Sequence, residues 1–178
     1  MESQAFLSTL AVEQQRVKSN RVAGVKIALL VLSSRAMAFD THSLRHEILL
    51  TYPDATVFFR TTQGKPIGPE SPRHVDLVID FTGPRQRQGW LYAKRLRSMA
   101  RFAVGRNAGL FRKKIYDRVY DEKSSKIASR LPADLFERER HVQREVLGLA
   151  GVAFIQQGSP GPDRGKTIAL ELPPLNRL

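Results

Sequence analysis

The sequence predicts an α/β fold, a Rossmann-like three-layer α/β/α sandwich around a mostly parallel sheet. Two apolar, β-branched runs carry this prediction, residues 25–34 (VKIALLVLSS) and 75–83 (VDLVIDFTG), and each stops abruptly at small polar residues. A run that is apolar on both faces suits a strand whose sheet is covered by helices on both sides. Such runs alternate with segments of helical period, which favours parallel strands joined by helices.

Composition agrees with one domain that has a core of its own. The chain has 178 residues, of which 42% are hydrophobic, and we divide it into an N-terminal helical arm (1–24) and one α/β domain (25–178). No cysteine is present, which excludes disulfides, thiolate metal sites and cysteine nucleophiles. No apolar run reaches the roughly 20 residues of a spanning helix, and the N-terminus has no secretory pattern. We therefore expect a cytoplasmic protein.

The N-terminal arm has two interpretations. Its first half carries Phe6, Leu7 and Leu10, and residues 14–21 are polar and basic. It is either a terminal helix that packs or frays, or an interfacial helix whose apolar side chains enter lipid while its bases meet anionic headgroups at the inner face of the membrane.

The first half of the domain is expected to form one β-α-β unit. Residues 25–32 form a strand, residues 38–50 have a helical period, and residues 55–60 (ATVFFR) form a second strand. Pro53 ends the helix, because proline disfavours helical geometry in the preceding residue. Residues 61–73 contain five glycines and prolines, so they are predicted to be a surface loop.

The second half continues the alternation. We predict strands at 75–81, 101–104 and 167–172, and helices at 88–99 and 133–150. The last helix has alternating charges on its solvent side. Its inward residues are predicted to be Leu135, Val142, Val146, Leu147 and Leu149.

The charge is strongly basic and unevenly spread. The net charge is +12, which favours polyanionic partners. Residues 85–114 contain no acid, and the bases of this span are Arg85, Arg87, Lys94, Arg95, Arg97, Arg101, Arg106, Arg112, Lys113 and Lys114. This span is either a binding surface or a solvated helix face. Aromatic residues are interleaved with it (Trp90, Tyr92, Phe102, Phe111, Tyr116 and Tyr120), which keeps nucleic acid open as an alternative partner, although several of them have core spacing.

Several catalytic and cofactor motifs are absent. The turn after the first strand has no glycine, so it lacks the dinucleotide fingerprint, and no phosphate-binding loop motif is present. His42 and His46 are spaced to share a metal, but no carboxylate motif accompanies them. We expect no cofactor and no metal.

The polar strand ends remain as the candidate site. The hydroxyls and backbone N–H groups of Ser33 and Ser34 can cap the next helix and hold a phosphate or sugar oxygen. Asp80 lies at the end of the third strand, on the opposite face from Leu77 and Ile79. Its carboxylate could hydrogen-bond a substrate hydroxyl or cap the following turn, and the sequence leaves both open.

The order and spacing of these motifs resemble the N-terminal half of lipopolysaccharide heptosyltransferases, which belong to glycosyltransferase family nine. The resemblance rests on residues 27–34 (IALLVLSS), 52–55 (YPDA), 75–83 (VDLVIDFTG) and 136–152 (FERERHVQREVLGLAGV). It implies a single half-domain of the GT-B architecture. In that family the first domain binds the acceptor, a growing lipopolysaccharide core, and a second domain binds a nucleotide-activated sugar, commonly ADP-heptose.

The sequence departs from the family at two points. The family turn after the first strand reads roughly Ser-Ser-x-Gly-Asp, and its carboxylate is the general base; here Ala36 stands at the glycine and Met37 at the aspartate. A methionine cannot take a proton, so we assign no catalytic residue, and Asp40 lies three residues further on. The chain also ends at Leu178, about where the donor domain would begin. Any hexosyl or heptosyl transfer would therefore need a donor domain supplied by another chain or region.

The leading hypothesis is an acceptor-binding, glycosyltransferase-like domain with an anionic glycan or a lipopolysaccharide precursor as its partner. Its expected binding residues are Ser33, Ser34, Arg35, Asp80, Gly83, Arg85 and Arg87. The alternatives are a basic nucleic-acid-binding domain and one half of a split glycosyltransferase.

Overall fold

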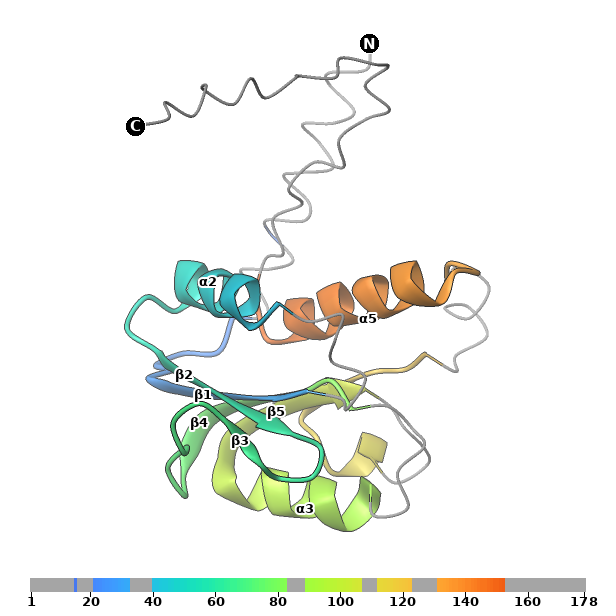
Figure 1. The fold of residues 1–178 in the computed structure, drawn as a ribbon. Helices are drawn as coiled ribbons and strands as arrows, with labels where there is room; N and C mark the ends of the chain where they lie inside the picture. The colour runs from blue at the N-terminus through green and yellow to red at the C-terminus, as the bar shows by residue number, and fades with distance from the viewer. Residues whose placement is uncertain are drawn as a thin grey trace, which may run out of the picture.

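A six-stranded sheet lies between two layers of helix in the computed structural model, which describes residue 15 and residues 21–32, 40–82, 89–106, 112–122 and 131–152 (Figure 1). The three-layer α/β prediction is confirmed. The arm, apart from residues 15 and 21–24, and the predicted strand at 167–172 lie outside the described residues. Among the described helices, none combines the length and the apolar character that crossing a bilayer requires.

The sheet is parallel except at one edge. Its strands in spatial order are β3 (Pro66–Ile67), β2 (Thr56–Thr61), β1 (Ile27–Leu32), β4 (Val75–Asp80), β5 (Ala100–Arg106) and β6 (Arg118–Tyr120). Only β3 pairs antiparallel, with β2. The central pair, β1 and β4, is parallel with Val31 opposite Asp80. The two runs that predicted the fold are therefore neighbours at the centre of the sheet.

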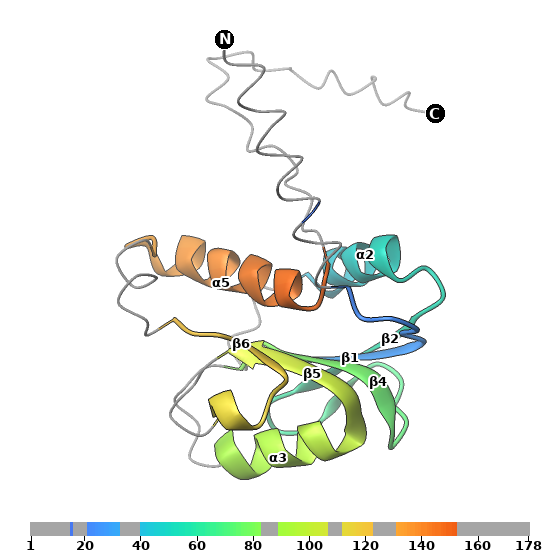
Figure 2. The ribbon, with the colours of Figure 1, turned by 180° about the vertical axis from the view of Figure 1, so that it is seen from behind.

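Helices cover the two faces unequally. Helices α2 (Thr41–Thr51) and α5 (Leu135–Leu149) lie on one face, and α3 (Gly89–Met99) lies on the other (Figures 1 and 2). A 3-10 turn, η2 (Arg112–Lys114), lies beside α3 in both views. The core accordingly has two parts, one on each face of the sheet.

Strand β1 explains why the sheet needs both layers. Leu30 packs in the part of the core shared with α2 and α5, while Leu29 and Val31 pack in the part shared with α3. All three side chains have no exposed surface. A strand that is apolar on both faces is stable only when both faces are covered, which is the reason why its unbroken apolar run predicted the fold.

Two local predictions were wrong. The predicted loop at 61–73 contains β3. Proline cannot donate a backbone hydrogen bond, but it is tolerated in an edge strand, and Pro66 lies there opposite Arg60. Leu135 does not face inward: it is 71% exposed, since it is the first residue of α5 and the buried residues of that helix begin at Val142. Strand β6 was not predicted, because three residues show too little alternation.

Tyr52 joins three segments beneath the α2 and α5 layer. The backbone N–H of Val22 donates to its hydroxyl oxygen at 2.9 Å, and the hydroxyl donates to the carbonyl of Ala150 at 2.5 Å. Burial raises the pKa of Tyr52, and the hydrogen bond from Val22 opposes that rise. One hydroxyl thus fixes the entry to β1, the end of α2 and the end of α5.

We expect Tyr52→Phe to lower the free energy of unfolding by about 1–3 kcal/mol, because it leaves a partly buried N–H and a buried carbonyl without this partner. Tyr120→Phe is the matched control, since the Tyr120 ring is also buried but no described hydrogen bond involves its hydroxyl. Denaturant unfolding followed by circular dichroism measures both variants. Equal losses for the two would contradict the role given to the Tyr52 hydroxyl.

Candidate ligand edge at the ends of the central strands

The connections that follow β1 and β4 cross opposite faces of the sheet. The β1 connection passes through α2 on one face, and the β4 connection passes through α3 on the other (Figure 1). Between such strands the order of the sheet reverses, and open α/β sheets bind ligands outside the carboxyl ends of the strands at that point. The candidate site is therefore the edge at Leu32 and Thr82, here called the switch edge.

Most of the predicted binding residues follow the switch edge in sequence but lie outside the described residues. These are Ser33, Ser34, Arg35, Gly83, Arg85 and Arg87, together with Met37. Their binding role stays a prediction. Leu32 and Thr82, from which the two segments continue, are buried, so the base of the edge is well defined.

Asp80 is the one predicted site residue that the structure describes, and it is engaged internally. It has no exposed surface. One carboxylate oxygen accepts the backbone N–H of Thr82 at 2.9 Å, and the other accepts the hydroxyl of Tyr116 at 2.5 Å. Of the two roles that the sequence left open, the cap of the following turn is the one seen here. Asp80 thereby orients the chain as it leaves β4.

Gly105 makes the contact between Asp80 and Tyr116 possible. It lies opposite Asp80 in the β4–β5 register, and a Cβ built at this glycine would stand 2.7 Å from the Tyr116 ring. Any side chain at this position would push the ring, and with it the hydroxyl, away from the carboxylate. No local pattern in the sequence signals this constraint, because Tyr116 meets Gly105 only in the fold.

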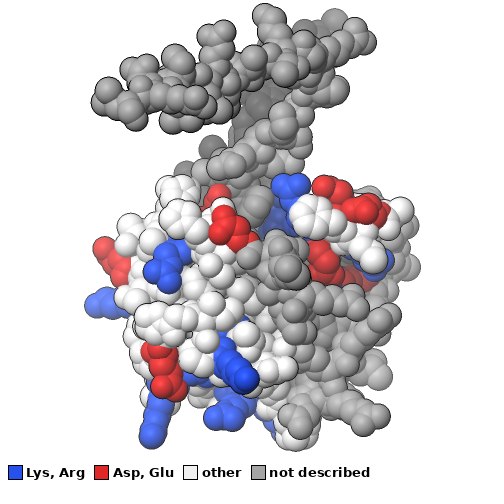
Figure 3. Space-filling view, viewed as in Figure 1, with Lys and Arg blue, Asp and Glu red and all other residues white. Residues whose placement is uncertain are grey.

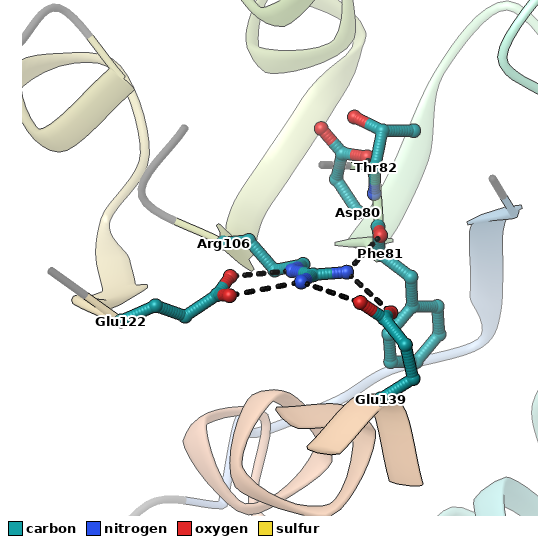
Figure 4. A network of polar contacts seen from close by, with 6 residues as sticks. All are labelled: Asp80, Phe81, Thr82, Arg106, Glu122 and Glu139. Atoms are coloured by element: carbon teal, nitrogen blue, oxygen red, sulfur yellow. Dashed lines mark hydrogen bonds and ion pairs between the residues drawn. The ribbon is translucent and has the colours of Figure 1, made fainter. Parts of the chain in front are cut away.

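Arg106 forms the main polar network beside the switch edge (Figure 4). Its guanidinium bonds two oxygens of Glu122, at 2.5 and 2.9 Å, and two oxygens of Glu139, at 2.7 and 3.0 Å. A longer bond of 3.4 Å reaches the carbonyl of Phe81. The residues of this Arg106 cluster come from the end of β5, the end of β6, α5 and the end of β4.

The Arg106 cluster is a structural clamp with no donor left for a ligand. The five N–H groups of a guanidinium are matched by four carboxylate contacts and one carbonyl. Burial opposes the charge of Arg106, but the hydrogen bonds that it donates to Glu122 and Glu139 outweigh this effect and raise the pKa of Arg106. The stabilisation that accompanies a raised pKa is lost only as the pH climbs through the raised value, so it is fully present at physiological pH. With two acids and one base, the cluster carries a net charge of −1.

The described bases of the acid-free span at 85–114 differ in their surroundings. Arg106 is buried in its cluster, and Arg97 pairs with Asp117 at 3.0 Å. On the face in Figure 3, the basic side chains of the described residues are separated by acidic and neutral ones. Tyr116 and Tyr120 are buried, as their core spacing suggested. The fold brings acids from later in the chain to bases that had none nearby in sequence.

Asp40, the nearest carboxylate after Met37, caps α2. Its two oxygens accept the backbone N–H of His42 at 2.9 Å and the hydroxyl of Ser43 at 2.6 Å. The hydrogen bonds from Ser43 and His42 hold its pKa below the ordinary value of 3.8. A general base works best with a pKa near the operating pH, so Asp40 is poorly suited to replace the family's carboxylate.

In the described part of the chain, metal binding and the surface hollow at the other end of the sheet are the two remaining candidates for a site. Within the described ranges, no group of three or more His, Asp or Glu residues is placed to hold a metal ion. A shallow hollow of about 350 Å³ lies at the amino ends of the central strands, lined partly by His74, Asp76 and Arg101. Asp76 is committed there to the backbone N–H groups of Lys26 and Ile27. This hollow lies at the opposite edge from the one where such sheets bind ligands.

Comparison with protein-family models and with curated protein sequences found no match. The class of this protein is defined by its fold: it is a Rossmann-like α/β domain with a switch edge.

We expect Arg106→Met to lower the free energy of unfolding by about 3 kcal/mol, because it leaves the largely buried carboxylate of Glu122 unpaired. Arg106→Met combined with Glu122→Gln should recover part of that loss, since the unpaired charge is then gone. Urea unfolding of the three proteins measures this. A single variant as stable as the original chain, or a double variant less stable than the single one, would show that the cluster does not hold the edge.

The cap of α2 predicts a pH dependence. Because the pKa of Asp40 is lowered in the folded state, its stabilisation is present above the ordinary value of 3.8 and is lost as the pH falls through the folded value. Asp40→Ala should therefore lower the melting temperature at pH 7, with a smaller difference at pH 3. Asp40→Asn, which keeps a good N-cap, is the control. If Asp40→Ala lowered the melting temperature equally at both pH values, the ionised cap would be ruled out.

Proposed function

We propose that this chain is an acceptor-binding module related to the lipopolysaccharide heptosyltransferases, and that it binds an anionic glycan or a phosphorylated lipid headgroup at the switch edge. The single observation that supports this most is the position of the edge. The buried strands β1 and β4 are neighbours, and their connections leave to opposite faces of the sheet. The two segments that carry the predicted binding residues continue from these strand ends.

The proposed ligand is an anion, and the bases that would bind it are those near the switch edge that are not paired with an acid. Arg106, which contacts the carbonyl of Phe81 beside the edge, is paired with Glu122 and Glu139. Attraction of an anion therefore falls to Arg35, Arg85 and Arg87. Guanidinium groups bind phosphate and carboxylate through paired hydrogen bonds, which suits the phosphorylated sugars of a lipopolysaccharide core.

Binding without transfer is the activity proposed for the chain by itself. Met37 stands where the resemblance places the general base and has no proton-accepting group. Asp40, the next carboxylate, is held by its cap and has a lowered pKa. Sugar transfer would require both a base and a nucleotide-sugar site from another chain or region. The setting we propose is the bacterial cytoplasm, at the inner face of the membrane.

The test is the affinity for phosphorylated lipopolysaccharide core oligosaccharides, measured by isothermal titration calorimetry. We expect Arg85→Gln/Arg87→Gln to weaken binding by about tenfold or more, because hydrogen bonds between charged groups contribute about 1.5–3 kcal/mol each. The matched control is Lys26→Gln/Arg73→Gln, which removes two exposed charges at the opposite edge of the sheet.

Unchanged affinity in the arginine variant would contradict the proposed site. Absence of binding to the core oligosaccharides, together with salt-dependent binding of single-stranded RNA in a mobility-shift assay, would contradict the proposed function and favour the nucleic-acid alternative.

A further inference from the structure

The outer face of α3 combines exposed apolar and basic side chains. Trp90 is 43% exposed and Leu91 is 62% exposed, although both belong to a helix whose opposite side packs Ala93 and Leu96 against the sheet. Lys94 and Arg95, one turn further on, are also exposed. The ammonium of Lys94 stands 4.1 Å from the centre of the Trp90 ring. These four residues form the α3 outer face.

The surroundings of this face are basic. The eleven residues of α3 include no acid. Lys113 and Lys114, in the η2 turn that lies beside α3, are exposed as well (Figures 1 and 2). Two described acids lie nearby: Asp117 pairs with Arg97 of this helix at 3.0 Å, and Asp121 lies 4.0 Å from the ammonium of Lys113. The tryptophan and leucine side chains of this face suit an apolar environment, and its lysine and arginine suit negative charges. The complementary partner therefore has a negative surface above an apolar layer.

We propose that the α3 outer face docks on an anionic lipid bilayer. Tryptophan and leucine enter the boundary between headgroups and acyl chains, where a large amphipathic ring is stable. Lysine and arginine reach the headgroups, each contributing through the negative potential of the surface. A second copy of this chain is a poorer occupant of the face, because like charges at Lys94 and Arg95 would meet across a two-fold interface.

This docking is independent of the proposed function, but the two are compatible in space. Helix α3 begins directly after the segment that leaves β4, so its first turn lies at the switch edge. A bilayer beneath Trp90 and Leu91 would hold that edge close to the membrane surface. Vesicles without glycans test the docking alone, while soluble oligosaccharides test the glycan site alone.

The chain contains a single tryptophan, so the fluorescence of Trp90 reports directly on this face. We expect its emission to shift to shorter wavelength when vesicles of phosphatidylglycerol and phosphatidylcholine are added to the full chain. Vesicles of phosphatidylcholine alone should cause no shift, and added salt should weaken binding. Lys94→Gln/Arg95→Gln should reduce partitioning about 30-fold, equivalent to about 2 kcal/mol for two charges. Leu91→Ser should reduce it about tenfold.

Two control variants match these changes. Lys26→Gln/Arg140→Gln also lowers the net charge by two, from +12 to +10, but at exposed positions outside α3. Leu50→Ser removes a leucine that is 54% exposed on α2, the opposite face of the sheet. Both controls should partition like the original chain, and circular dichroism should show that all variants fold.

Three results would overturn the proposal. The first is unchanged Trp90 emission while the protein co-sediments with anionic vesicles, which would place another segment, such as the N-terminal arm, at the membrane. The second is equal binding to neutral vesicles. The third is an equal loss of partitioning in the α3 variants and in their controls.

Discussion

Arg106 binds the carboxylates of Glu122 and Glu139 and the carbonyl of Phe81 at the place where three parallel strands end. Parallel strands contact one another through backbone hydrogen bonds, but their ends separate unless something joins them. Here one guanidinium joins the ends of β4, β5 and β6 to α5. Because the side chains of Arg106 and Glu122 are largely buried, removing either one would leave the charge of the other poorly compensated, and that cost keeps the arrangement fixed.

The end of β4 is also held on the other face of the sheet. Asp80 receives the Tyr116 hydroxyl and the Thr82 backbone N–H, while Gly105 leaves room for the tyrosine ring. The end of β4 is thus held from both faces, by Arg106 on one and by Tyr116 on the other. A rigid base of this kind allows the segments that follow a strand to present binding groups at defined positions.

The fold separates bases that are paired with acids from bases that stay exposed. Arg97 and Arg106 form ion pairs with acids that come later in the chain. Lys94 and Arg95 stay on the outer face of α3, next to Trp90 and Leu91. A net charge of +12 therefore does not describe one basic surface. Each base has to be judged by its partners before it is assigned to a ligand.

The sequence by itself determined the class of fold, the central strands and the three main helices. It could do so because strands buried on both faces need an unbroken apolar run, and helices on a sheet need a regular apolar period. It also predicted the face of the sheet to which Asp80 points, by the alternation of side chains along β4.

Only the tertiary structure decided what the charged residues do. The acid-free span at 85–114 suggested a basic surface, but Glu122 and Glu139 lie outside that span and reach Arg106 only through β6 and α5. Asp80 could be a ligand contact or a cap until Tyr116 was placed beside it. Burial patterns are local and repeat along the chain, whereas ion pairs and buried hydrogen bonds depend on which distant segments meet, and that is why the first could be predicted and the second could not.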